Sequence, residues 1–335
     1  MPSTRSRFTN NEFHAAVQNV VGAPLSLLKP VIGHPIKTTT RGETPRVDPF
    51  GSNLKKLRAA LGGGTLRNHN SFVDLLSYWL ARASVEHRGG KQGRPQTCKD
   101  LFSRVSVNFR HRFGVEGTKT LQEIIPDLLI DGRFLSTTLD GAGANLLRGT
   151  KTLADVKTLS YNDKYPAERS GLACAVVTKR QQEVNEQYHK KAGELDLEQG
   201  TAPGSTGRFR KELNEYGQKG RVIAPVVGAF AEMSPDTYAI AGLISSVLAN
   251  EHCSFFTDKP SEAKGMFTQR LYRSLGLAAH LGWARLLVDR YRDLVEVPAP
   301  TREDPRGGRH HFAPDDEDAF EHENYHNPDS FHHTH

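Results

Sequence analysis

Apolar residues at helical spacing predict four long helices in this chain. In the first of them, Phe72, Leu76 and Leu80 recur every fourth residue and therefore lie on one face of a helix. A helix with one apolar face must pack that face against another element of the fold. The predicted helices span residues 68–83, 171–196, 234–250 and 261–294.

Shorter apolar runs predict four strands between and around these helices. Val105, Val107 and Phe109 alternate with polar residues, which favours a strand with one buried face. The run RVIAPVVGAF at 221–230 is almost wholly apolar, as in a strand buried on both faces. The glycine-rich segment GAGAN at 141–145 is predicted to be a loop. The predicted strands span residues 101–113, 124–130, 152–159 and 221–230.

The order of helices and strands predicts an α/β sandwich, with a central mixed sheet that helices cover on both faces. A chain of 335 residues is long enough to bury a large core. We expect an irregular lead-in over residues 1–50, where prolines interrupt a short apolar patch that could form a helix. A folded domain over residues 51–297 follows. The tail, residues 298–335, has few aliphatic side chains and is expected to be disordered.

Charge is unevenly distributed along the chain. The net charge is +6, but from Thr301 onward nine acidic residues oppose only three basic ones. Residues 1–300 therefore carry 41 basic and 29 acidic side chains. Such a body suits a polyanionic partner such as nucleic acid, although solubility alone would also explain it. The tail holds seven of the fifteen histidines, which could bind transition metals adventitiously but lack a fixed scaffold.

Several classes of protein are disfavoured by composition. No apolar run approaches the roughly 20 residues that a membrane-spanning helix needs, so no membrane partner is expected. The first residues lack the apolar core of a secretory signal. Cys98, Cys174 and Cys253 are far apart in the sequence and form no disulfide framework. We therefore expect an intracellular protein, nuclear or cytoplasmic, that is not secreted.

The clearest chemical signal is Pro126-Asp127 followed by Asp155-Val156-Lys157. Hydrolysis of a phosphodiester commonly uses a divalent cation bound by carboxylates, together with a positive group that positions the attacking water. Strand alternation places Asp155 and Lys157 on one face of the sheet, and Asp127 can come alongside them from the neighbouring strand. The alternative is a pair of ordinary surface strands with an exposed lysine.

These short strings are weak signals when they are taken alone. Pro-Asp recurs at residues 235, 314 and 328, and an acidic-x-Lys string recurs at Glu262–Lys264. Only Pro126-Asp127 leads directly into an apolar strand that is followed by a strand with Asp-x-Lys. Asp236 and Lys264, which belong to the other strings, are expected to tolerate alanine.

The segments PDLLIDG and LADVKTL, followed by a long helix, resemble the PD-(D/E)XK phosphodiesterase superfamily. The resemblance implies a restriction-endonuclease-like fold and a DNA endonuclease that depends on Mg²⁺ (or Mn²⁺). Asp127 and Asp155 would bind the metal, with the main-chain carbonyl of Val156 as a further ligand. Lys157 would orient or activate the water.

A narrower resemblance covers roughly residues 47–290. The segments VDPFGSNL, TLRNHNSFVDLL and VVGAFAEMSPD are similar, in order, to nuclease-like regions found with reverse transcriptases of eukaryotic retroelements. This implies a link to a mobile element and its proteins. Those regions often carry a zinc-ligand stretch. Here Asp48 and Gly51 remain, but Asn53 and Leu57 replace the histidine and cysteine, so no zinc is expected.

Two further polar residues share apolar helix faces. His69 lies on the face of Phe72 and Leu76, either as a core or capping histidine or as a residue near the metal or a phosphate. Gln181 shares the stripe of Val177, where a buried amide needs partners. Some PD-(D/E)XK nucleases carry a glutamine on this helix, so the resemblance implies a catalytic role for Gln181.

Basic residues in two predicted surface segments are candidates for nucleic-acid binding. We expect them to grip the phosphate backbone together with His69. An alternative function is a nucleic-acid-binding or nucleoprotein-like structural protein whose nuclease fold no longer cuts. The candidate contacts are Lys91, Arg94, Arg110 and Arg112.

Overall fold

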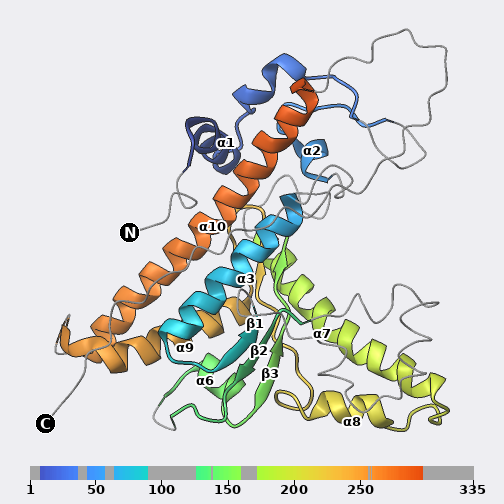
Figure 1. Cartoon of the computed structure of the whole chain (residues 1–335), viewed down its shortest axis with the longest axis vertical. Coiled ribbons are helices and arrows are strands. Elements are labelled where there is room, and N and C mark those ends of the chain that lie inside the picture. The colour runs from blue at the N-terminus through green and yellow to red at the C-terminus, as the bar shows by residue number, and fades with distance from the viewer. Residues whose placement is uncertain are drawn as a thin grey trace, which may run out of the picture. The chain divides into compact units, whose positions relative to one another are not determined.

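A computed structural model of the chain describes residues 8–36, 44–56, 64–89, 126–136, 139–159, 172–255, 257 and 259–296. These residues form a mixed α/β unit within Met1–Val297 that is mostly helical and contains a small sheet (Figure 1). No described helix combines the length and apolar character needed to cross a membrane. The predicted tail and the predicted strand at 101–113 lie outside the described residues.

The long helices lie close to their predicted positions, with shorter helices between them. The helices are α1 (Asn10–Val20), η2 (Ser26–Val31), α2 (Ser52–Lys56), α3 (Gly64–Arg82), α6 (Ala142–Leu147), α7 (Leu172–Glu198), α8 (Arg208–Asn214), α9 (Pro235–His252), η5 (Cys253–Phe255) and α10 (Pro260–Glu296). The strands are β1 (His87–Gly89), β2 (Leu128–Asp131), β3 (Lys151–Ala154), β4 (Lys157–Thr158) and β5 (Val226–Val227).

Two small sheets, one of three strands and one of two, meet at the segment that contains β3 and β4. On one side β3 pairs with β2 in antiparallel fashion, and β2 in turn pairs with β1. On the other side β4 pairs with β5 in parallel fashion. Main-chain bonds continue this pairing between β3 and β4, where the Asp155 and Lys157 N–H groups donate to the carbonyls of Ile223 and Pro225 at 2.9 Å. The prediction that the second and third strands are neighbours is confirmed by the β2–β3 pair.

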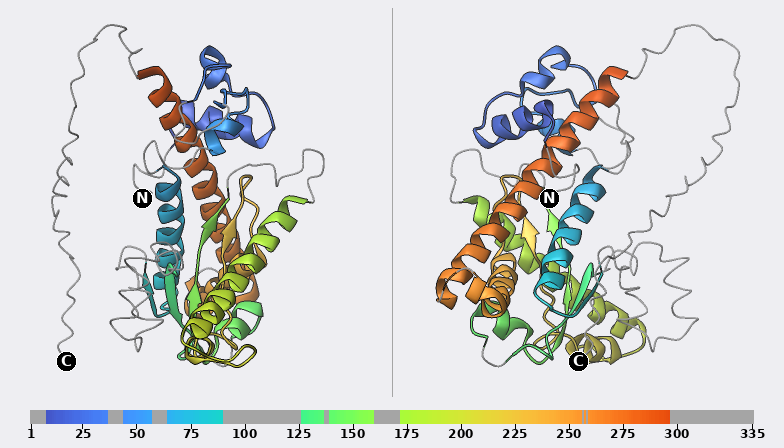
Figure 2. Two further views of the ribbon diagram at one scale, coloured as in Figure 1. Left: turned by 90° about the vertical axis from the view of Figure 1, so that its right-hand side faces the viewer. Right: turned by 60° about the vertical axis from the view of Figure 1, so that its left-hand side comes forward.

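Helices cover both faces of these strands. Leu128, Ile130 and Val156 belong to a core shared with α3, α6, α9 and α10. Leu153 and Ala224 belong to a second core shared with α7 and α8. Because successive strand residues point to opposite faces, the alternation along each strand separates these two cores. Figures 1 and 2 show α3 and α7 on opposite sides of the strands.

The predicted lead-in is more regular than expected. Helix α1 begins with a capping box, in which the Thr9 hydroxyl accepts the Glu12 N–H and the Glu12 carboxylate accepts the Thr9 N–H. Its small residue Ala16 packs with Leu28 and Leu287 in a third core along α10 (Figure 1). The helix that the apolar patch allowed is present as α1, and η2 adds a second regular element, because apolar contact with α10 orders both helices.

The predicted loop at 141–145 is also wrong, because these residues begin helix α6. Glycine disfavours helix interiors, so the sequence alone favours a loop. At Gly143, however, a Cβ atom would lie only 2.0 Å from the carbonyl oxygen of Ala239 in α9. The absence of a side chain lets the two helices approach closely, and this packing outweighs the low helix propensity.

The strand predicted at 221–230 is shorter than expected. Only Val226–Val227 forms a regular strand, with an isolated bridge between Ala154 and Ile223 before it. Pro225 has no N–H to donate, so the ladder cannot be continuous through this residue.

Gly143→Ala should lower the free energy of unfolding by about 1–3 kcal/mol, because a methyl group must push α6 away from α9. Gly242→Ala is the matched control within α9, where a Cβ would meet nothing within 4 Å. That change should raise stability by up to about 1 kcal/mol through helix propensity. Urea denaturation followed by circular dichroism compares both variants, and equal stability of the two would contradict the described packing.

Candidate active site

Asp127 occupies a special position at the edge of β2. Its main-chain N–H donates to the Ala154 carbonyl at 2.9 Å, while its Oδ2 atom accepts the N–H of Val156 at 2.9 Å. The side chain thus replaces a main-chain partner just where the β2–β3 ladder ends. Asp127 is buried, so this bond offsets part of the cost of removing its carboxylate from water.

Asp155 and Lys157 form an ion pair beside this carboxylate. The Lys157 Nζ atom donates to Asp155 Oδ1 at 2.6 Å, and Asp155 is only 4% exposed. Burial raises the pKa of Asp155 to about 6; the positive charge of Lys157 opposes this rise, and the neighbouring Asp127 carboxyl adds to it. The Asp127 carboxylate accepts the N–H of Val156, the residue after Asp155, and the Asp127 carboxyl group contributes to the raised pKa of Asp155.

His69 reaches the same place from the second turn of α3. Its Nε2 atom lies 3.2 Å from Asp127 Oδ2 and 3.0 Å from the Val156 carbonyl oxygen. Its Nδ1 atom lies 3.3 Å from Asn70 Oδ1. Burial alone would lower the pKa of His69, but the hydrogen bond to Asp127 and its negative charge, with Asn70 and the Val156 carbonyl, outweigh burial and raise that pKa. Of the two interpretations of His69, the one that places it beside the predicted site agrees with this geometry.

The other predicted site residues do not join this group. Gln181 is half-buried between the buried residues Val177 and Val184, and its Oε1 atom accepts the N–H of Asp236 at 3.0 Å. That bond ties α7 to the first turn of α9, so a catalytic role for Gln181 stays a prediction. The proposed phosphate contacts Lys91, Arg94, Arg110 and Arg112 lie outside the described residues.

Asp236 is more important to the structure than the mere recurrence of Pro-Asp at residue 235 suggests. It is buried, and its two carboxylate oxygens accept the Arg221 guanidinium at 2.7 Å and the Ala224 N–H at 2.9 Å. Burial raises the pKa of Asp236, while the Ala224 N–H and Arg221 act in the opposite direction. Asp236 therefore anchors the segment that pairs with Lys157, and the expectation that it tolerates alanine is revised. The Ser-Pro-Asp start of α9, with proline at the first helical position, is the sequence signal for this role.

Gly89 supports the site from β1, and sequence reasoning missed it. A Cβ atom at Gly89 would lie 2.2 Å from the main-chain oxygen of Asp127. Its φ angle of +127° also disfavours any side chain. The sequence signal for this role is the pair Gly89-Gly90, which is equally typical of a loop.

The donor atoms at this site are compatible with a divalent cation. Within the described part of the chain, no three or more His, Cys, Asp or Glu side chains are grouped to hold a metal ion. The predicted donor set does not depend on such a group, because it consists of two carboxylates and the Val156 carbonyl. Oxygen donors of this kind are those that Mg²⁺ and Mn²⁺ accept. Asp127 Oδ2 accepts the N–H of Val156, the residue that follows Asp155, so carboxyl groups from adjoining positions could serve a cation of this class.

The segment that resembles a zinc-ligand stretch forms a hydrogen-bonded turn. Asp48 Oδ1 accepts the N–H groups of Phe50 and Ser52, and Asp48 Oδ2 accepts that of Asn53. The Asn53 side chain donates to the Arg46 carbonyl. These bonds cap the start of α2, which gives Asp48 a structural role.

Comparisons with protein-family models, with curated proteins and with solved structures found no match for this chain.

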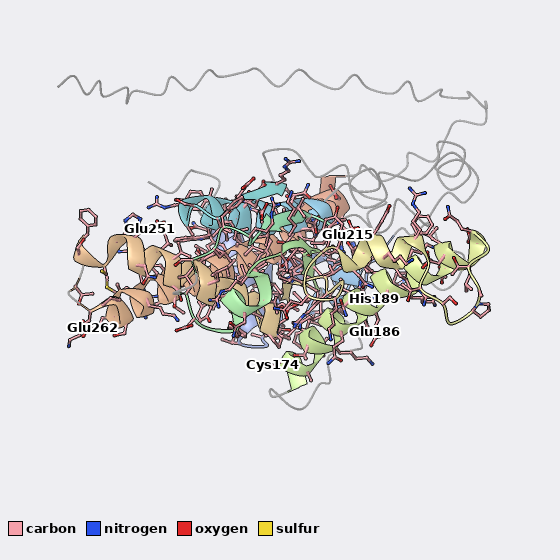
Figure 3. The ribbon with its side chains drawn as sticks, turned by 90° about the horizontal axis from the view of Figure 1, so that it is seen from below. Cys174, Glu186, His189, Glu215, Glu251 and Glu262 are labelled. Atoms are coloured by element: carbon pink, nitrogen blue, oxygen red, sulfur yellow. The ribbon has the colours of Figure 1, made fainter. Side chains whose placement is uncertain are left out.

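Asp236→Ala should lower the free energy of unfolding by about 1–3 kcal/mol, because it leaves the buried Ala224 N–H without an acceptor. Lys264, an exposed residue of α10, provides the control. Lys264→Ala should change the free energy of unfolding by less than about 0.5 kcal/mol. Glu262, which precedes Lys264 in the acidic-x-Lys motif, lies in the first turn of α10. Figure 3 shows it well apart from Glu186 and His189 of α7. Thermal and urea unfolding measure both variants; an Asp236→Ala protein as stable as Lys264→Ala would refute the anchoring role.

Proposed function

We propose that this protein is a metal-dependent phosphodiesterase, a DNA endonuclease with a restriction-endonuclease-like sandwich of the PD-(D/E)XK type. One observation carries the proposal: the Asp127 carboxylate accepts the N–H of Val156, next to Asp155, and the Asp155 carboxylate accepts the Lys157 ammonium group. Two carboxylates and a lysine at one strand junction are the parts that metal-assisted hydrolysis of a phosphodiester requires.

Each residue has a distinct role in this proposal. Asp127, Asp155 and the Val156 carbonyl hold Mg²⁺ (or Mn²⁺), which supplies Lewis-acid activation of water and phosphate when it is bound. Lys157 keeps a positive charge at the carboxyl groups and positions the attacking water or the phosphate. Main-chain bonds to the carbonyls of Ile223 and Pro225 hold this segment in place from the other side.

The surroundings of the site support the same proposal. The segment with Asp155 and Lys157 lies between an antiparallel and a parallel neighbour, and helices cover both faces of the sheet. Strands of both orientations between helices support the proposed sandwich. The basic excess of residues 1–300 suits DNA as the substrate, and association with a retroelement and an intracellular location complete the proposal.

The second candidate is a nucleic-acid-binding protein in which this fold no longer cuts. It is favoured by the fact that the site groups satisfy one another. Lys157 neutralises Asp155, while the Val156 N–H and His69 both contact Asp127 Oδ2. A site satisfied in this way is stable without a cation.

Asp155→Asn and Lys157→Ala should each reduce cleavage by on the order of 100-fold or more, because each removes one charge from the reacting centre. Asparagine keeps the shape of a buried carboxyl group, so Asp155→Asn should stay folded. Cleavage of plasmid and single-stranded DNA in Mg²⁺ or Mn²⁺ gives the measurement, with Lys264→Ala as the active control. DNA affinity should persist in both variants, since scattered basic residues provide it.

Wild-type protein that binds DNA and never cuts it with either ion would favour the binding-protein candidate. Undiminished cleavage by Asp155→Asn would exclude Asp155 from the site.

A further inference from the structure

The segment 223–227, which includes β5, is hydrogen-bonded along both of its edges. On one edge the N–H groups of Asp155, Lys157 and Leu159 donate to its carbonyl groups at 2.9, 2.9 and 2.8 Å. The main-chain groups of Ala224 and Val226 point to the other edge, because successive residues of an extended chain direct these groups to alternate sides. The first edge holds the main chain of Lys157, so whatever binds the second edge also affects where Lys157 lies.

Side chains at the start of α9 bind this second edge. The Ser234 hydroxyl accepts the Val226 N–H and donates to the Ala224 carbonyl, each at 3.0 Å. The Val226 carbonyl accepts the Ser234 N–H at 3.0 Å and the Thr237 hydroxyl at 3.2 Å. Asp236 accepts the Ala224 N–H. Three side chains thus take the place that a neighbouring strand would take.

Ser234 makes these bonds instead of capping its own helix. It is the N-cap residue of α9, a position where a serine hydroxyl normally accepts an N–H of the first turn and contributes about 1 kcal/mol. The Ser234 hydroxyl makes no such bond. Both Ser234 and Thr237 are fully buried. The hydroxyl of Ser234 therefore serves β5 in preference to α9, which indicates that the placement of β5 matters.

The ladder between β4 and β5 is too short to fix this placement alone. It pairs Lys157 with Val226 and Thr158 with Val227, so each strand contributes two residues. Pro225 lies in the same segment and has no N–H to donate. A slip of the pairing would take the Pro225 carbonyl away from the Lys157 N–H. Bonds from α9 to particular main-chain groups of the segment prevent such a slip.

We propose that Ser234 and Thr237 are positioning residues for the cleavage reaction: through β5 they place Lys157, whose Nζ atom donates to Asp155 Oδ1 at 2.6 Å. This inference rests on the proposed function, because it gives the two hydroxyl groups a task in that reaction. Both act through the main chain of the segment 223–227. Displacement of a reacting group by about 1 Å can slow a reaction by about 100-fold, so loss of either hydroxyl should reduce the turnover number.

The first test measures plasmid cleavage by the full-length protein at saturating Mg²⁺. Thr237→Val keeps the shape of threonine without its hydroxyl, whereas Thr237→Ser keeps the hydroxyl. Thr237→Val and Ser234→Ala should each lower kcat by on the order of 10-fold and leave KM within about 2-fold, because placement changes and DNA binding does not. Thr237→Ser should keep kcat within about 3-fold of wild type.

The second test follows Lys157 independently of cleavage. Acetic anhydride acetylates lysine side chains, and mass spectrometry gives the rate at Lys157, which is 28% exposed and held by Asp155. Ser234→Ala and Thr237→Val should raise this rate by about 3-fold or more, because Lys157 leaves its ion pair more often.

Asp196→Asn is the matched control for both tests. Asp196 is a buried carboxylate that accepts the N–H groups of Gly207 and Phe209, and these bonds tie the end of α7 to α8. The change should lower the melting temperature as the hydroxyl variants do, while kcat and the acetylation of Lys157 stay at wild-type values.

The outcomes separate this inference from the proposed function. Unchanged kcat and acetylation in Ser234→Ala and Thr237→Val would overturn the inference and leave the nuclease proposal standing. An equal fall in kcat for Thr237→Ser, or for Asp196→Asn, would also overturn it, since stability alone would then explain the loss. Wild-type protein that never cuts DNA would count against the nuclease. Faster acetylation of Lys157 in the two variants would then still support its placement by the hydroxyl groups, and unchanged acetylation would overturn that placement as well.

Discussion

The candidate site depends on one oxygen atom, Oδ2 of Asp127. It accepts the N–H of Val156 at the junction of β3 and β4, and it faces His69 from α3. A buried carboxylate without partners is costly, so each of these elements must hold its place for the fold to be stable. The junction lies against the core that joins α3, α9 and α10, because Val156 itself belongs to that core. Packing of the helices and geometry of the site therefore constrain each other.

Much of the fold follows from local patterns. The helix that became α3 was predictable because Phe72 and Leu76 repeat at helical spacing, and both are fully buried. Helix α6 was not predictable, because the reason for Gly143 is a carbonyl group in α9, far along the chain. Strand β1 has three residues, too few for an alternating pattern to be recognised. At Gly143 a tertiary contact outweighs a local preference, whereas β1 offers too short a pattern to be recognised.

The candidate site, like the fold, could be predicted only in part from the sequence. Asp155 and Lys157 could be paired from sequence, since alternation in a strand is a local property. Asp127 needed only the pairing of neighbouring strands. The contacts of His69 required the position of α3 over the sheet, which no pattern within the helix specifies. Gln181 was correctly placed among buried residues, but its partner is the Asp236 amide at the start of α9, which its own helix could not indicate.

The energetics of the junction bear on the choice between a nuclease and a binding protein. Replacing buried ion pairs by apolar side chains is often neutral or stabilising, so stability alone is a weak reason to bury Asp155 beside Lys157 and Asp127. Burial raises the pKa of Asp155 to about 6, although the positive charge of Lys157 acts in the opposite direction. Perturbed groups of this kind occur in structural networks but are concentrated at functional sites. Asp236, by contrast, accepts hydrogen bonds at both oxygens and anchors a strand, so the fold alone accounts for it. This contrast supports the proposal that the carboxyl groups of Asp127 and Asp155 bind a cation.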